Sequence, residues 1–85
     1  MADQEVQQAV DAHVERMLTE SRELTQRIGK LSIFVSSEGS AFETLPALEQ
    51  HLLASQLMTM QAYSAILDMR IKLATDRGVF LAETE

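Results

Sequence analysis

The sequence contains no cysteine and no tryptophan, and it has one proline and three glycines. The absence of cysteine excludes disulfides, thiolate nucleophiles and cysteine-rich zinc sites. The 85 residues predict a single domain over 1–85, and a chain of this length buries a smaller fraction of its surface than a larger protein does. Self-association is the supplement that we expect for such a thin core.

Basic residues are also few. Seven Lys and Arg against thirteen Asp and Glu give a formal net charge of -6, which opposes approach to phosphate backbones and anionic lipid surfaces. We therefore expect neither a nucleic acid polymer nor a membrane as a partner. The sequence has no apolar run of bilayer length, and its start, MADQEVQQAV, lacks the regions of a signal peptide. These features predict a cytoplasmic protein.

The first half of the chain has the periodicity of an amphipathic helix. Its apolar residues alternate in steps of four and three, and Ser21 is the one polar member of the series. The apolar members are Val10, Val14, Met17, Leu24, Ile28, Leu31 and Val35. The outer positions, Glu20 among them, are expected to be solvated. The pattern predicts a helix over about residues 4–36 and a turn over about 37–44, in SSEGSAFET.

A second helix is predicted over about residues 45–77. Pro46 suits its first turn and Thr44 is placed to cap it, while Gly78 is a natural end, followed by a short apolar tail. The predicted fold class is all-α, a long antiparallel two-helix hairpin with arms of about 45 Å. Because the second helix is apolar around most of its circumference, we expect hairpins to assemble into a homo-oligomeric helical bundle of even order, a tetramer or hexamer.

Four residues of the second helix recur every seventh position within EQHLLASQLMTMQAYSAILDMRIKLA, and we call them the polar ladder: Glu49, Gln56, Tyr63 and Arg70. One interpretation is that they fix the register of a symmetric bundle. The other is a nucleotide pocket between protomers, with Tyr63 offering a π-face, Arg70 an anion donor and Gln56 hydrogen bonds to a base or ribose. A buried Arg70 would need either Glu49 of a neighbouring chain or a ligand phosphate.

Three further residues are candidates for such a pocket. Met60 is a packing residue that can also line a ligand surface. Arg27 and Lys30 form a basic pair near the turn, which is either a solvated face or an anion contact. No Ser/His/Asp grouping, glycine-rich phosphate loop, HExxH or GxSxG motif is present, and neither histidine has a carboxylate at metal-ligand spacing. We therefore expect no catalysis, no cofactor and no metal.

The run from Arg27 to Ala74 resembles a family of small helical proteins of crAss-like and other tailed phages. The matching positions are Lys30, Leu31, Phe34, Leu52, Leu53, Gln56, Met60, Tyr63, Leu67, Arg70 and Ile71. That family is similar in size and plan to the phage nucleotide sponges, including anti-CBASS sponges and Sequestin, which are oligomers that sequester nucleotide immune signals without cleaving them. The N-terminal arm and DRGVFLAETE lie outside the pattern.

The resemblance implies a binding function in the cytoplasm of an infected bacterial host cell. The implied ligand is a nucleotide-derived signal, either a cyclic ADP-ribose isomer or a cyclic oligonucleotide. A structural or protein-interaction helical oligomer without a small-molecule ligand is the alternative hypothesis, because periodicity alone favours the polar ladder as a device that sets register.

Overall fold

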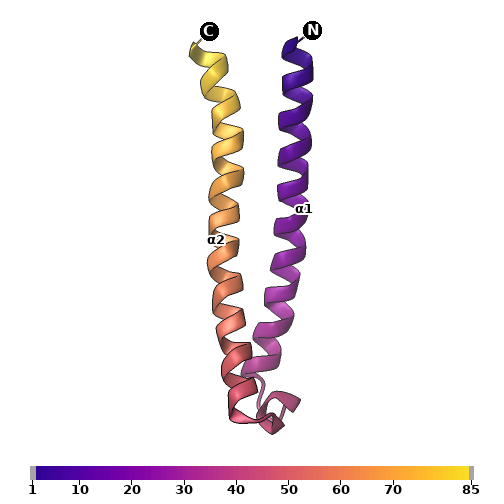
Figure 1. Ribbon diagram of the computed structural model, residues 1–85, viewed down its shortest axis with the longest axis vertical. Coiled ribbons are helices and arrows are strands. Elements are labelled where there is room, and N and C mark those ends of the chain that lie inside the picture. The colour runs from indigo at the N-terminus through magenta and orange to yellow at the C-terminus, as the bar shows by residue number, and fades with distance from the viewer. Residues whose placement is uncertain (1, 85) are drawn as a thin grey trace.

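The protein is a long hairpin of two antiparallel helices (Figure 1). The computed structural model describes the backbone of residues 2–84 and the side chains of residues 4–76. Helix α1, Ala2–Ser36, and helix α2, Ala47–Thr84, are joined by a loop that contains a short 3-10 helix, η1, Ala41–Thr44. The hairpin measures 59 × 18 × 18 Å. The predicted all-α fold class is confirmed over the described residues, which include no strand.

The two helices meet along a narrow row of apolar side chains, which we call the hairpin seam. Met17 and Leu24 of α1 are 4% and 6% exposed and pack with the fully buried Leu67 of α2. Their neighbours in the seam are partly buried: Val14, Ile28, Met60, Tyr63, Ile71 and Ala74. Residues seven apart lie on the same side of a helix, so the seam in α1 follows the predicted four-three spacing.

The loop is fixed by local hydrogen bonds at the position of the predicted turn. Gly39 has a φ of +71°, a left-handed conformation that glycine adopts without steric cost. Its N–H donates to Glu43 Oε2 at 3.1 Å, and Ser40 Oγ donates to the Phe34 carbonyl at 2.9 Å. The rings of Phe34 and Phe42 meet edge to face with centroids 5.8 Å apart. The turn therefore sets the level at which the two helices face each other.

Helix α2 begins differently from the prediction. The Thr44 hydroxyl donates to the Ala41 carbonyl at 2.6 Å. It therefore provides a hydrogen bond to a carbonyl of η1 and does not cap α2. The Pro46 carbonyl accepts the first bond of the helix, from Gln50 N at 3.0 Å. The Gln50 side chain also turns back and donates to the Leu45 carbonyl at 2.8 Å. The expected capping role of Thr44 was wrong because the intervening 3-10 turn uses its hydroxyl.

The C-terminal bound of α2 also differs from the prediction. The helix continues to Thr84, past the end that we expected near Arg77 and Gly78. Glycine inside a helix costs only about 1 kcal/mol relative to alanine, and the residues that follow include the good helix formers Leu, Ala and Glu. Gly78 permits a helix end without enforcing one. The expected packing of the apolar residues 79–81 lies outside the described side chains.

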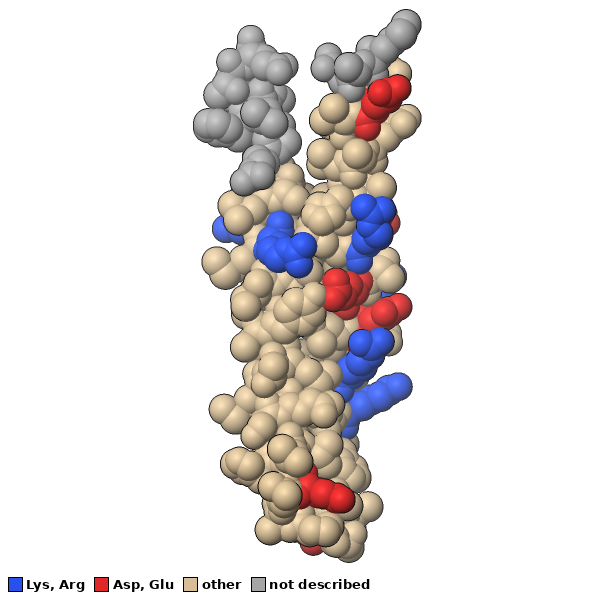
Figure 2. Space-filling model, in the orientation of Figure 1, with Lys and Arg blue, Asp and Glu red and all other residues tan. Residues whose placement is uncertain are grey.

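Helix α2 carries a second apolar row that α1 does not cover, and we call it the outer stripe. Its large members are between 55% and 69% exposed: Leu48, Leu52, Ile66, Met69 and Leu73. They lie within an arc of about 100° on a helix with 3.6 residues per turn. On the face that Figure 2 shows, most charged side chains lie over α1, and fewer lie over α2.

The outer stripe represents unused hydrophobic stabilisation. Fully burying one large apolar side chain contributes about 1.5–3 kcal/mol. Covering the exposed fractions of the five side chains would therefore contribute on the order of 5–9 kcal/mol per chain. The hairpin seam, with three buried side chains among the described residues, is thin by comparison. In their described residues, the helices contain no segment of the length and apolarity needed to cross a bilayer.

Candidate functional site

The polar ladder follows the border between the hairpin seam and the outer stripe. Tyr63 is half-buried against the seam, whereas Glu49, Gln56 and Arg70 are exposed. At 100° per residue the sequence has apolar residues on both flanks of the ladder, and in the structure these two flanks are the hairpin seam and the outer stripe. A residue repeated every seven positions drifts by about 20° per heptad on a straight helix. The ladder therefore shifts from the side of the seam at Glu49 toward the outer stripe at Arg70.

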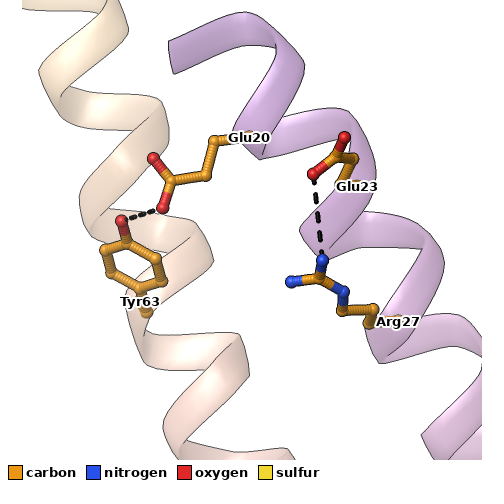
Figure 3. A network of polar contacts seen from close by, with 4 residues as sticks. All are labelled: Glu20, Glu23, Arg27 and Tyr63. Atoms are coloured by element: carbon orange, nitrogen blue, oxygen red, sulfur yellow. Dashed lines mark hydrogen bonds and ion pairs between the residues drawn. The ribbon is translucent and has the colours of Figure 1, made fainter. Parts of the chain in front are cut away.

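Tyr63 is held by a bond between the two helices (Figure 3). Its hydroxyl donates to the carboxylate oxygen Oε1 of Glu20, forty-three residues away in α1. This bond raises the pKa of the Tyr63 phenol, with smaller contributions from desolvation and from the negative charge of Glu20. The Arg70 cation has the opposite effect on the pKa of Tyr63. We call the three residues Glu20, Tyr63 and Arg70 the Tyr63 cluster.

Gln56 and Met60 continue this surface toward the loop. Gln56 Nε2 lies 3.9 Å from Met60 Sδ, one helical turn away. Met60 is half-buried in the hairpin seam, so its thioether forms the border between the exposed amide of Gln56 and the core. The structure thus places the four candidate residues of α2, Gln56 to Arg70, along one edge about 21 Å long.

Arg27 lies apart from Arg70. It follows Glu20 by one heptad, and Gln56 precedes Tyr63 by one heptad, so the antiparallel arrangement sets Arg27 level with Gln56 and about 20 Å from Arg70 along the axis. Arg27 Nη2 is 3.8 Å from Glu23 Oε2, with both side chains mostly exposed. Such a pair contributes about 0.3–0.5 kcal/mol, which leaves Arg27 free to exchange its partner.

Lys30 is exposed on α1, three residues beyond Arg27. A step of three residues rotates the side chain by about 60° around the helix, which takes Lys30 off the line defined by Glu20 and Arg27. The structure therefore does not bring Lys30 and Arg70 together within one chain. The two basic residues expected to assist Arg70 lie instead toward the loop end of the hairpin.

Glu20 is the site residue that sequence reasoning missed. Its position among charged residues of α1 is typical of a solvated face, and only the register of the hairpin reveals its partner. Met17 and Leu67 face each other in the seam. A residue three places after Met17 must then lie near the residue four places before Leu67, because the helices run in opposite directions. That relation, available once the register is known, places Glu20 beside Tyr63.

The chemistry of this edge suits recognition of a polar ligand. It offers an aromatic face, a planar guanidinium and an amide that can both donate and accept. Among the described residues, no group of three or more His, Asp or Glu side chains is placed to hold a metal ion.

Comparison with known protein families gives a match over most of the chain. A family model described as Sequestin matches residues 11–73, which is more than half of the chain. The matched segment includes Glu20 and all six residues that we selected from the sequence as ligand-binding candidates. No curated protein and no solved structure matches the chain.

Proposed function

Because the chain belongs to the Sequestin family, we propose that it is a phage anti-defence sponge. It binds and sequesters a nucleotide-derived immune signal, a cyclic ADP-ribose isomer or a cyclic oligonucleotide, and does not cleave it. Its place of action is the cytoplasm of the infected bacterial host cell. The family relationship favours sequestration over catalysis, and a sponge needs only a binding surface and sufficient protein to lower the free concentration of the signal.

The observation that carries this proposal is the fixed position of the Tyr63 ring. The bond to Glu20 restrains the ring at an exposed edge of the hairpin, and a restrained side chain loses less entropy when a ligand binds. We assign Tyr63 to stacking on a base or ribose, Arg70 to a phosphate and Gln56 to the polar edge of the base. Met60 supplies apolar contact between Gln56 and Tyr63.

The charge of the site constrains how the ligand lies. The protein is acidic overall, and Glu20 places a carboxylate directly at the Tyr63 hydroxyl. A ligand phosphate is therefore repelled from the α1 side of the ring and attracted to Arg70 on the other side. Arg27, level with Gln56, supplies a second cation for a ligand that carries two separated phosphates. Lys30 adds positive charge at the same end of the hairpin.

Self-association belongs to this proposal. The outer stripe leaves large apolar side chains exposed in a single chain. The free energy gained when two chains bury their stripes together is comparable with the roughly 4–15 kcal/mol that association costs. A homo-oligomer of even order, a tetramer or hexamer, covers this surface and multiplies the number of sites.

The exposed outer stripe also favours a second candidate function. A structural or protein-interaction oligomer would use the same surface without any small-molecule ligand, and the polar ladder would then set the register of its helices. The two functions differ in one measurable property, because only the sponge is stabilised by nucleotides.

A thermal-shift screen with cyclic dinucleotides, cyclic ADP-ribose isomers and ADP-ribose tests the proposed function. A ligand present at 100 times its dissociation constant stabilises the native state by about 2.7 kcal/mol. For a domain of this size that corresponds to a rise in Tm of roughly 10 °C or more. A rise with one class of nucleotide supports the sponge. Unchanged melting with the whole panel favours the structural alternative.

A further inference from the structure

The outer stripe has a pattern that matches itself when one copy is reversed. Three small residues, Ser55, Thr59 and Ala62, occupy its middle and continue the four-three spacing of its large members. The large side chains are at its ends, with Leu48 and Leu52 at one end and Ile66, Met69 and Leu73 at the other. A second helix can therefore approach this surface most closely at its centre, where the side chains are small.

We propose that two copies of the chain pack their α2 helices antiparallel along the outer stripe. The pairs across the contact are Leu48 with Leu73, Leu52 with Met69, Ser55 with Ile66 and Thr59 with Ala62. Ile66 of each copy then fills the space beside the small Ser55 of the other, and the flexible Met69 packs against Leu52, so the contact is closely packed. A parallel pair would stack Ser55, Thr59 and Ala62 on their own copies and leave the centre underfilled. Such a pair is also a unit from which a tetramer or hexamer can be built.

The polar ladder is complementary to itself in the same arrangement. In an antiparallel pair the two-fold axis is perpendicular to the plane of the two helices, so the same flank of each copy lies on the same side of the pair. The ladder of one copy therefore runs beside the ladder of the other in the opposite direction. Glu49 of each copy then lies beside Arg70 of the other, and Gln56 beside Tyr63. In a parallel pair the ladder would face the flank that carries Met58, Ala65 and Lys72, where the residue closest in level to Arg70 is the cation Lys72.

The contact also completes the nucleotide site, and this step rests on the proposed function. Helix α1 packs on α2 from the seam side of the ladder, and the second copy covers the stripe side. The two ladders therefore form the floor of a groove between the two α1 helices. Each half of the groove takes Tyr63 and Arg70 from one copy and Gln56 from the other. The two-fold symmetry produces two equivalent sites. A single hairpin does not contain a complete site.

Cysteine cross-linking tests the direction of the contact, because the natural chain has no cysteine. We expect a mixture of the variants L52C and M69C to form a disulfide-linked pair under mild oxidation. Neither variant alone should do so, because like positions lie about 25 Å apart along the axis in the antiparallel pair, and a disulfide spans a Cα separation below about 7 Å. Cross-linking of either variant alone, or an unlinked mixture, would overturn the proposed contact.

Light scattering of the ligand-free protein tests the face that is used. Leu52→Glu should reduce the measured mass to the 9.5 kDa of one chain while the circular dichroism of the helices is retained, since this side chain is exposed in the hairpin. The matched control is Ile33→Glu, at a residue of α1 that is 67% exposed and off the stripe, and it should keep at least twice that mass. The reverse pattern would place the interface on α1.

The two proposals fail separately in these experiments. Cross-linking between L52C and M69C needs no ligand, so it tests the contact independently of nucleotide binding. If the cross-link forms and no nucleotide of the panel raises Tm, the contact is supported and the sponge function is rejected. Nucleotide binding to a protein of one-chain mass would retain the sponge and overturn the shared site.

Discussion

The hydroxyl of Tyr63 on α2 donates a hydrogen bond to the carboxylate of Glu20 on α1. This contact joins the helices at the edge where the hairpin seam ends and the polar ladder is exposed. It holds the half-buried ring of Tyr63 in one orientation beside the core of the hairpin. Glu20 therefore acts as a positioning residue for the proposed ligand site, and its removal should change the properties of Tyr63 before it changes the fold.

The first prediction concerns the titration of Tyr63. The chain has one tyrosine and no tryptophan, so phenolate absorbance near 295 nm reports on this residue alone. We expect a midpoint above the usual value of about 10, because the bond to Glu20 favours the protonated phenol. Glu20→Gln should lower the midpoint, and Arg70→Ala should raise it. A wild-type midpoint at or below that of the unfolded chain would contradict the observed bond.

The same shift predicts a pH dependence of stability. The pKa of Tyr63 is raised in the folded state, so its contribution to the free energy of unfolding is fully present below the unfolded pKa of about 10. The contribution is lost as the pH rises through the folded pKa. Urea unfolding at pH 8 and pH 11 should show a smaller loss for Tyr63→Phe than for the wild type. Equal losses would show that Tyr63 does not contribute.

The third prediction concerns Arg70. Arg70→Ala should abolish binding of a nucleotide identified in the thermal-shift screen, and Arg70→Lys should weaken it because the two-pronged donor is lost. The oligomer should survive both changes, since exposed ion pairs contribute at most about 1 kcal/mol. The matched control is Lys72→Ala, which removes an exposed cation of α2 outside the ladder. Loss of the oligomer in Arg70→Ala would identify the residue as a determinant of register.

The fourth prediction separates stacking from apolar contact at Tyr63. Tyr63→Phe should retain most of the nucleotide affinity, whereas Tyr63→Leu should lose roughly the 1–3 kcal/mol per base that aromatic stacking contributes. Calorimetry gives both affinities, and light scattering checks that assembly is unchanged. Equal affinities for the wild type and Tyr63→Leu would remove the ring from the site.

The fifth prediction concerns the hairpin seam. Leu67 is fully buried, so Leu67→Ala should reduce the free energy of unfolding by about 2–5 kcal/mol. The control Ile33→Ala changes a mostly exposed residue and should stay within about 0.5 kcal/mol of the wild type. Urea unfolding followed by circular dichroism measures both. Similar effects of the two substitutions would mean that the seam does not stabilise the hairpin.

The sequence predicts the hairpin well because its signals are local. The four-three spacing around Met17 and Leu24 specifies which face of α1 is buried, and the glycine at position 39 marks the turn. The outer stripe also follows from periodicity, since Leu48 and Ile66 differ from the seam residues in phase. These features depend only on residues within a few turns of one another.

The arrangement of the site depends on contacts between the helices, and the sequence predicts less of it. Glu20 has no local feature that marks it as a partner of Tyr63. The sequence leaves open whether the polar ladder sets the register of a bundle or binds a ligand, because the same polar residues on one side of a helix suit both roles. The end of α2 was misplaced for a different reason, since a single glycine weakens a helix by too little to end it.

The claim that the protein sequesters a nucleotide intact is tested most directly by recovering the ligand from the complex. The wild-type protein is saturated with the nucleotide that raises its Tm, separated from free ligand and denatured, and the released compound is analysed by chromatography. We expect the unmodified nucleotide, in an amount proportional to the protein. Hydrolysis products in the released fraction, or no retained ligand for any compound of the panel, would contradict the account.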